Sequence, residues 1–398
     1  MDAPAPMRWS SVGSDAADFQ EAITACAEGV ARALETSEPD LVMVFVSPAH
    51  RESYLRIPDI LQACFPSAVI CGCSGAGVIG GGEEIEQRPG FALVAARLPD
   101  VITRPFHIDA PALASLSESP TKIREQIGLD PEQTAGIILL AEPFTGDTGV
   151  LLHALDRGYP TTPKIGGIAS GGGRPGHNVL YADGEARGTG VAGVALGGAI
   201  EVDTIVAQGC RPIGAPLFVT RSRDNVIHEL DGRRPVEALQ DLYEQLSPRD
   251  QRLTRDSLFL GIATRRDASR YGPGDFLVRN IIGLDPKSGA LAVGTLVATN
   301  LVVQFHVRDA ETSAADLADH LGAYRSRAAE RPAGALLFSC LGRGEQLYGR
   351  PNHDTEMLSE FLGPVPVGGF FCNGEIGPVH TQTHLHGYTS AFGLFRRP

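Results

Sequence analysis

Two charged residues lie among glycines directly after apolar runs, where a side chain can reach a bound ligand. Arg343 lies between Gly342 and Gly344 after the run GALLFSCL, and Glu375 lies in the sequence CNGEIG. A guanidinium can hold a carboxylate through two parallel hydrogen bonds, and a carboxylate can pair with an ammonium group. Together the two residues would suit an amino-acid ligand. The alternative is an internal salt bridge between Arg343 and Glu375 that joins two loops.

Glycine-rich loops follow apolar runs at three places, in the sequences VICGCSGAG, KIGGIASGGG and VGGFFCNGEIG. Glycine can adopt positive φ and leaves its N–H groups unshielded by a Cβ atom, so successive glycines can form an anion-binding concavity. For any single loop, a tight exit from a strand is the simpler explanation. The recurrence favours a ligand-facing role for at least one loop. The candidate ligand-binding residues are Arg343, Glu375, Gly72, Ser74, Gly75, Gly167, Ser170, Gly369 and Asn373.

Three histidines near Cys372, namely His380, His384 and His386, are of the residue type that binds zinc. The segment follows Pro378 and runs into a strand, so the three imidazoles need not converge. No CxxC pair accompanies them. We therefore expect no metal and no cofactor.

Cysteine chemistry is the alternative to ligand binding without turnover. A thiolate from Cys340 or Cys372, with His386 as base, would define a hydrolase or transferase. Thiols within apolar strands are usually inert packing groups, however. The chain also has no GxSxG elbow, no P-loop lysine and no dinucleotide-binding fingerprint. We expect no enzymatic activity.

The composition indicates a soluble globular protein. With 398 residues, of which 43% are hydrophobic, the chain can bury a large core and form two domains. A net charge of −13 argues against a general binder of nucleic acid or anionic membranes, which needs clustered Lys and Arg. No secretory signal or membrane-spanning run is evident, so we expect no membrane insertion. Seven scattered cysteines favour reduced thiols and a cytoplasmic location.

The elements that must position these residues recur three times. Each unit has an apolar run, a helical stretch, a second apolar run that begins after proline, a glycine-rich loop and a third apolar run. The helical stretches are residues 52–64, 147–158 and 353–362, and Asp147 is expected to cap the second. An amphipathic helix over residues 15–34, capped by Ser14 or Asp15, precedes the first unit. Strands alternating with helices predict the α/β class, with glycine-rich loops at equivalent strand ends.

The segment 257–317 has a different pattern. Aliphatic runs separated by turn clusters at 271–275 and 285–289 predict a hairpin or meander, and a helix is expected over 312–329. Because the repeat pattern breaks within 220–231, we predict two mixed-sheet domains, 1–222 and 223–398.

These motifs resemble those of the FIST family. DLVMVFVSP, VICGCSGAGVI, IGGIASGGG and GVAGVALGG are similar to the FIST N-terminal domain, and FLVRNIIGLD, FSCLGRG, GGFFCNGEIGPV and LHGYTSAFGLF are similar to the FIST C-terminal domain. The resemblance implies a sensory module for small ligands, amino acids among them. No F-box or output domain is recognisable, so signalling would require a separate partner protein or oligomerisation. A scaffold that binds protein without a ligand is the remaining alternative.

Overall fold

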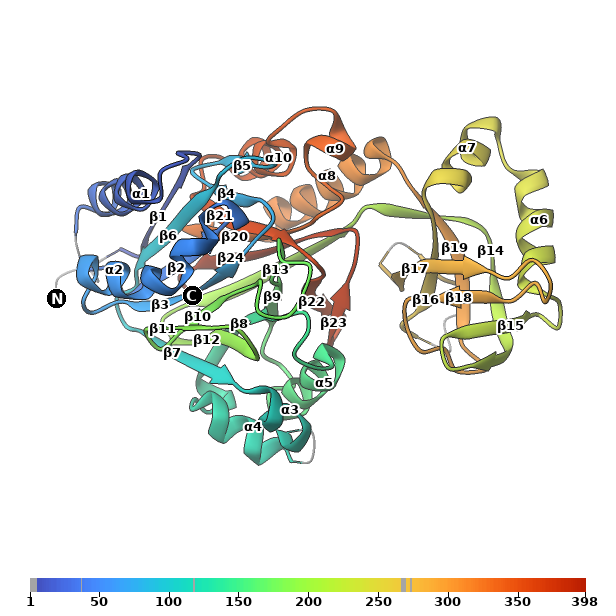
Figure 1. The fold of residues 1–398 in the computed structure, drawn as a ribbon, viewed down its shortest axis with the longest axis horizontal. Coiled ribbons are helices and arrows are strands. Elements are labelled where there is room, and N and C mark those ends of the chain that lie inside the picture. Colours follow the sequence, from blue (N-terminus) through green and yellow to red (C-terminus); the bar gives the residue numbers. More distant parts are fainter. Residues whose placement is uncertain (1–5, 37, 117–118, 266–269, 273) are drawn as a thin grey trace. The chain divides into compact units, whose positions relative to one another are not determined.

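The computed structural model describes residues 6–36, 38–116, 119–265, 270–272 and 274–398, which form two compact units (Figure 1). Unit 1 comprises Met1–Val206, Ala318–Leu385 and Thr389–Pro398, and unit 2 comprises Ala207–Leu317 and His386–Tyr388. Mixed sheets and helices confirm the predicted α/β class. In the part of the chain that the structure describes, no helix is both long and apolar enough to cross a lipid bilayer.

Three six-stranded sheets, one for each repeat, build unit 1. The centre of each sheet is a parallel pair: β2 (Leu41–Val46) with β3 (Val69–Ser74), β8 (Thr134–Ala141) with β9 (Lys164–Ile168), and β20 (Gly334–Cys340) with β21 (Val367–Cys372). The third strand of each repeat lies antiparallel to the first: β6 (Phe91–Arg97), β12 (Val191–Gly198) and β24 (Thr389–Arg396). The next strand outward is β1 (Arg8–Ser14), β7 (Val101–Ile108) or β13 (Glu201–Gln208).

A short hairpin from a different repeat completes each sheet. The hairpin β4 (Val78–Gly80)–β5 (Glu83–Ile85) of the first repeat pairs with β21 of the third. The hairpin β10 (Leu180–Ala182)–β11 (Glu185–Arg187) of the second repeat pairs with β3 of the first. The hairpin β22 (Glu375–Val379)–β23 (Gln382–His386) of the third repeat pairs with β9 of the second. The exchange therefore runs around all three repeats and closes on itself.

The register of the parallel pairs is the same in all three repeats. In each pair a glycine of the second strand lies opposite the same position of the first strand, as Val44–Gly72, Leu139–Gly166 and Leu337–Gly369. A Cβ atom on these glycines would lie 1.9, 1.8 and 1.8 Å from the carbonyl oxygen of the partner residue. Only glycine permits this close approach. The prediction that the three glycine-rich loops lie at equivalent strand ends is confirmed.

The helices of the repeats follow their predicted positions closely. The helices are α2 (Ile57–Cys64), preceded by the 3₁₀ helix η1 (Pro48–Arg56), α5 (Thr148–Gly158) and α10 (His353–Leu362). Asp147 caps α5 as predicted, because its carboxylate accepts a hydrogen bond from Gly149 N at 2.8 Å. Two short helices, α3 (Ala110–Leu116) and α4 (Pro120–Ile127), precede β8.

The first helix of the chain begins later than predicted. Helix α1 (Phe19–Leu34) is capped by Asp18, whose carboxylate accepts from Glu21 N at 2.8 Å, so the expected cap at Ser14 or Asp15 is wrong. Ser14 instead ends β1, which pairs with β6. The helix packs its apolar face against β1 and β6 (Figure 1), and each fully buried aliphatic side chain there stabilises the fold by about 1.5–3 kcal/mol.

Unit 2 is a closed six-stranded barrel in which the recorded pairings are antiparallel. Its strands are, in order around the barrel, β14 (Cys210–Arg223), β15 (Val226–Leu230), β18 (Leu291–Val293), β17 (Phe276–Leu284), β16 (Leu258–Ala263) and β19 (Val302–Arg308). Helices α6 (Pro235–Gln245) and α7 (Pro248–Asp256) lie between β15 and β16 in the sequence. The β16–β17 hairpin confirms the predicted meander; residue 273 of its expected turn lies outside the described residues.

The barrel also bears on the predicted domain boundary. Residues 220–231 belong to the β14–β15 hairpin, and the chain returns to unit 1 within helix α8 (Ala310–Arg327), which corresponds to the helix predicted over 312–329. The division into 1–222 and 223–398 stays a prediction about family domains.

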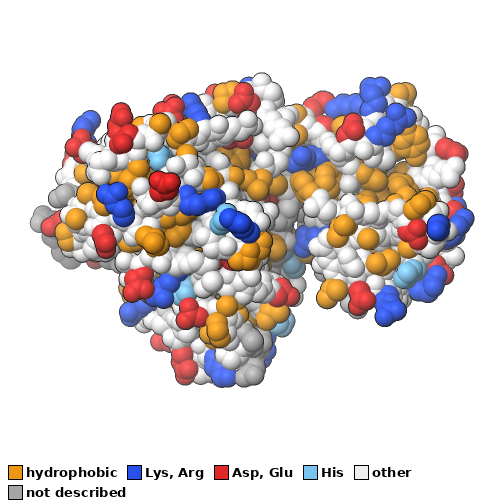
Figure 2. Space-filling view, in the orientation of Figure 1, with side chains coloured by type: hydrophobic (Ala, Val, Ile, Leu, Met, Phe, Trp, Pro, Cys, Tyr) orange, Lys and Arg blue, Asp and Glu red, His pale blue; other side chains and the backbone are white. Residues whose placement is uncertain are grey.

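Unit 2 exposes large apolar side chains, among them Phe218, Ile282 and Leu296, and Figure 2 shows hydrophobic side chains on the visible face of this unit.

Candidate functional site

A buried ion pair lies beyond the carboxyl end of β20 in unit 1. Arg343 donates to Asp354 Oδ2 from Nε and to Asp354 Oδ1 from Nη2, both at 3.0 Å. Arg343 is fully buried, and Asp354, in the first turn of α10, is 1% exposed. Nη2 also donates to the hydroxyl of Tyr348 at 2.6 Å, and the Tyr348 ring stacks on His353. Both donors of the guanidinium fork are therefore used inside the protein.

Asp354 is the centre of this polar cluster. Besides the two bonds from Arg343, its carboxylate accepts from the Ser339 hydroxyl at 3.2 Å, interacts with His353 Nδ1 at 3.0 Å, and accepts from the Ser390 hydroxyl. Burial alone would raise the pKa of Asp354. The charge of Arg343 and the hydrogen bonds from His353, Arg343 and Ser390 instead hold that pKa well below its usual range. Asp354 is thus ionised throughout the physiological pH range.

Glu375 is fully buried at the start of β22. One carboxylate oxygen, Oε2, accepts from Thr389 Oγ1 at 2.7 Å and from Thr389 N at 3.2 Å. Burial raises the pKa of Glu375 to about 8, although the bonds from Thr389 and the charge of Arg343 act in the opposite direction. Burial therefore favours the neutral form of the Glu375 carboxyl.

Besides Glu84 Oε2, two buried polar atoms of this region have no hydrogen-bond partner among the described residues, namely Arg343 Nη1 and Glu375 Oε1. Within the same described part of the chain, Arg343 forms its ion pair with Asp354 and none with Glu375, so the predicted alternative of an Arg343–Glu375 salt bridge is wrong. Because a buried polar atom without a partner costs about 1–3 kcal/mol, these two atoms need an explanation.

A second pair of carboxylates comes from the β4–β5 hairpin. Glu84 Oε1 accepts from Thr355 N at 2.9 Å, and Glu86 Oε1 accepts from Glu345 N at 2.9 Å. Burial, with the charge of Asp354 adding to it, raises the pKa of Glu84 to about 8. Asn352 Oδ1 accepts from Glu84 N at 2.8 Å. These bonds attach both ends of the segment 345–352, which contains α9 (Glu345–Tyr348), to the hairpin.

The three repeats provide an internal comparison for these polar residues. Positions paired equivalently to Ser339 and Ser390 hold Val46 and Phe91 in the first repeat and Ala141 and Val191 in the second. The position equivalent to Glu375 holds Val78 in the first repeat and Leu180 in the second. At these three positions the same architecture is built twice with apolar residues, so the strand pairing itself does not require Ser339, Ser390 or Glu375 to be polar.

The other predicted ligand residues are used within the protein. The Ser170 hydroxyl accepts from Ala76 N at 2.8 Å and donates to Phe371 O at 2.5 Å, and the Ser74 hydroxyl accepts from Val179 N at 3.2 Å. Asn373 N donates to Ile168 O at 3.0 Å. The predicted glycines are in close contact with neighbouring residues: Gly72 with Val44, Gly75 with Phe370, Gly167 with Cys372 and Gly369 with Leu337. The structure thus joins the loops to one another, while their part in ligand binding stays a prediction.

The surroundings of the thiols and histidines do not resemble those of a reactive site. Burial raises the pKa of Cys372 and Cys73 well above the usual value and that of Cys71 to about 12, which disfavours a thiolate nucleophile. Within the described ranges, no three His, Cys, Asp or Glu side chains come together in a way that could hold a metal ion. His380 and His384 belong to unit 1, whereas His386 groups with unit 2.

Sequence reasoning missed Asp354 as the partner of Arg343. It also missed Ser339, Ser390, Thr389 and Glu84. An alignment of the three repeats would have shown that the third one differs. Its strand β20 ends in FSC, whereas the corresponding strands β2 and β8 of the first two repeats end in uniformly apolar residues.

Comparison with known proteins gives the family. The model of the FIST N domain matches residues 40–233, and the model of the FIST C domain matches residues 235–378. Uncharacterized protein MT0656 of Mycobacterium tuberculosis is 34% identical over 382 residues, covering 96% of this chain and 98% of that protein. Uncharacterized protein Mb0898c of Mycobacterium bovis is 34% identical over 382 residues, covering 95% and 96%. A crystal structure of cyanuric acid hydrolase from A. caulinodans covers 98% of this chain and 99% of its own, with 8% identity and a TM-score of 0.38, too low to indicate a shared fold.

Proposed function

The chain belongs to the FIST family, and from this premise we propose that it is a sensory protein that binds a small ligand without catalytic turnover. We place the ligand at the carboxyl ends of β20 and β21, beside Arg343 and Glu375. One observation carries this placement: at the positions of Ser339, Ser390 and Glu375 the third repeat has buried polar residues where the first two repeats have apolar ones. Ligand sites of open α/β sheets also lie at the carboxyl ends of parallel strands.

The two unpartnered atoms suggest the chemistry of the ligand. Arg343 Nη1 can donate only, so it suits a carboxylate or carbonyl oxygen. Glu375 Oε1 can accept from an ammonium group once the carboxyl is ionised. An amino acid or a related carboxylate has both groups. Because the Arg343 fork is engaged by Asp354, the ligand oxygen would receive one hydrogen bond from this guanidinium rather than two.

Ligand entry would require part of the site to open, because both residues are fully buried. The segment 345–352 follows Arg343 in the chain and is attached to the β4–β5 hairpin through Glu345 N and Asn352 Oδ1, and its Tyr348 hydroxyl accepts a hydrogen bond from Arg343 Nη2. Opening this segment would break these three hydrogen bonds, and ligand binding would restore the closed form. The bound and free proteins would then differ at the surface, which is what a separate signalling partner would recognise.

The test is a thermal-shift screen of the full-length chain with the proteinogenic amino acids at millimolar concentration. A ligand that binds the native state raises the melting temperature by mass action. Each amino acid that raises it is compared with its carboxamide and with its deamino analogue, which lack the carboxylate and the ammonium group in turn. We expect both analogues to lose the stabilisation. If no amino acid shifts the transition, this ligand class is refuted.

The variant Glu375→Gln tests the placement of the site. Glutamine keeps an acceptor for Thr389 and resembles the neutral carboxyl, so the fold is retained, but it cannot pair with an ammonium group. We expect the affinity for the active amino acid to fall by about 2–5 kcal/mol. The matched control is Glu356→Gln, which removes an exposed carboxylate of α10. Equal affinities in the two variants would remove Glu375 from the site. Alkylation of thiols without loss of binding would weigh against a cysteine-dependent enzyme.

A further inference from the structure

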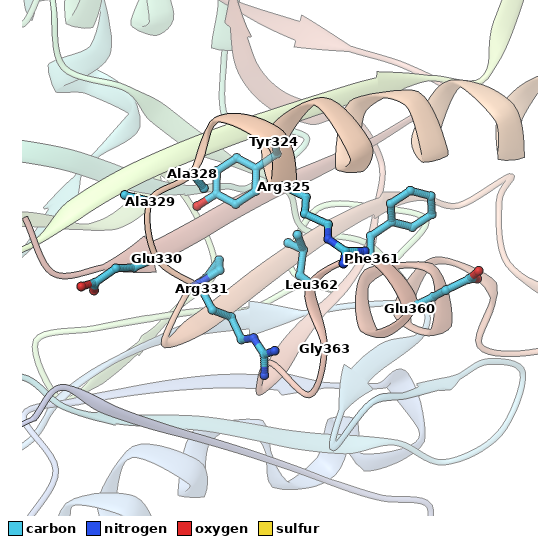
Figure 3. Close-up of a pocket in the computed structure, with 11 residues that line it drawn as sticks. Tyr324, Arg325, Ala328, Ala329, Glu330, Arg331, Glu360, Phe361, Leu362 and Gly363 are labelled. Atoms are coloured by element: carbon cyan, nitrogen blue, oxygen red, sulfur yellow. The ribbon is translucent and has the colours of Figure 1, made fainter.

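A cavity of about 330 Å³ opens at the ends of α8 and α10 in unit 1, apart from Arg343 and Glu375 (Figure 3). Its walls include Tyr324 and Arg325 of α8, Arg331 from the following turn, and Phe361 and Leu362 of α10. This volume is at the lower end of the range for small-molecule sites. Tyr324 and Leu362 are buried, so part of the wall is apolar and fixed.

The charged side chains around this cavity are unevenly arranged. Neither Arg325 nor Arg331 has a hydrogen bond or ion pair with another described residue, whereas most arginines of unit 1 are paired. Figure 3 shows the Glu330 and Glu360 side chains directed to opposite outer sides, while Arg325 extends beside Leu362 and Arg331 extends toward Gly363. Two guanidinium groups therefore lie along the cavity without a carboxylate partner, in a chain whose net charge is −13.

The helix ends nearby offer a competing explanation for the two arginines. Arg325 lies in the last turn of α8, and Arg331 lies against Gly363, the C-cap of α10, where a Cβ atom would be 2.7 Å from the guanidinium carbon. Each helix C-terminus carries about −0.5 of an elementary charge. Two such ends offset about one of the two positive charges, and Glu330 and Glu360 also line the cavity, so the case for an anion rests on the directed hydrogen bonds of the two guanidinium groups and not on net charge.

We propose that this cavity is a second ligand site, for a small organic anion whose carboxylate contacts Arg325 and Arg331 and whose apolar body lies against Phe361 and Leu362. Arginine suits this task because its planar group forms directed bonds to carboxylates. The site is independent of the proposed amino-acid site, since the two share no lining residue. Helix α10 nevertheless joins them, with Asp354 in its first turn and Leu362 at its last residue.

The experiment titrates the full-length chain with benzoate, using ligand-observed NMR, and repeats the titration with benzylammonium as a cation of similar size. Benzoate should bind saturably and benzylammonium should not. Arg325→Gln and Arg331→Gln should each weaken benzoate binding about ten- to hundredfold, which is the value of one charge-assisted hydrogen bond. The matched control is Arg104→Gln, because Arg104 is an exposed arginine of unit 1 that lies on β7, outside the cavity.

Three results would overturn the proposal. The first is benzoate binding that does not saturate. The second is benzoate affinity that Arg104→Gln lowers as much as the cavity variants, which would indicate general charge attraction. The third is a fall in melting temperature for Arg325→Gln and Arg331→Gln with unchanged benzoate affinity, which would assign both arginines to the helix ends alone. Glu375→Gln separates the two sites: it should leave benzoate affinity unchanged, and a loss there would place benzoate at the amino-acid site instead.

Discussion

Replacing Asp354 by Asn tests whether the buried cluster is held by charge. The carboxylate accepts two hydrogen bonds from Arg343 and is contacted by Ser339, His353 and Ser390. Asparagine has nearly the same shape, but it turns an NH₂ group toward these donors and leaves the buried guanidinium without a counter-charge. Breaking a buried pair in this way costs about 3–5 kcal/mol. That is a large share of a typical folding stability of about 5–15 kcal/mol.

Urea unfolding followed by tryptophan fluorescence measures this cost in unit 1. The chain has a single tryptophan, Trp9, which is buried in β1 and stacks on Phe395, so its signal reports on that unit. For a denaturant slope near 3 kcal/mol/M, the midpoint should fall by about 1–2 M. Glu356→Gln is the control, because it removes an exposed carboxylate from the same first turn and should cost about 0–1 kcal/mol. If Asp354→Asn costs no more than this control, the cluster is not a compensated buried ion pair.

Three further predictions concern stability. The pKa of Glu375 is about 8 in the folded protein against 4.5 for the free group, so its contribution to stability is present below about pH 4.5 and is lost as pH rises through 8. Glu375→Gln should reduce the slope of unfolding free energy against pH by up to about 1.4 kcal/mol per pH unit within this window. An unchanged slope would show that Glu375 does not titrate there. Gly72→Ala should lower the free energy of unfolding by about 3 kcal/mol or more, because the added Cβ would lie 1.9 Å from Val44 O. The control Gly173→Ala has open space around it and should change the free energy of unfolding by no more than about 0.5 kcal/mol in the same urea assay. Asp147→Ala should lower stability by about 1 kcal/mol through loss of the α5 cap, and a result equal to that of the exposed Glu356→Gln would argue against the cap.

Local sequence patterns predicted the repeats well because the strands, helix and loop of each repeat follow one another along the chain. The boundaries of α10 follow from helical spacing between a glycine-rich loop and a proline-led strand, and the structure places it at the predicted 353–362. Strand β1 was missed because WSSVGS lacks a continuous apolar run, and its pairing with β6 depends on residues about eighty positions away. The partner of Arg343 was missed for a related reason: the turn that brings Asp354 back to the guanidinium has no signature of its own.

The hairpin exchange between repeats has a consequence for how the chain is made. The first sheet lacks its outer strands until β10–β11 has been synthesised, and the second lacks its outer strands until β22–β23 has been synthesised. The third needs β24, which ends at Arg396, in its interior between β13 and β20. Strand edges of the early repeats therefore remain open on the ribosome for most of translation, and open edges invite pairing with other chains. Nascent chains stalled before β22 should consequently depend on chaperones, whereas released chains should reach the native state in a single late step.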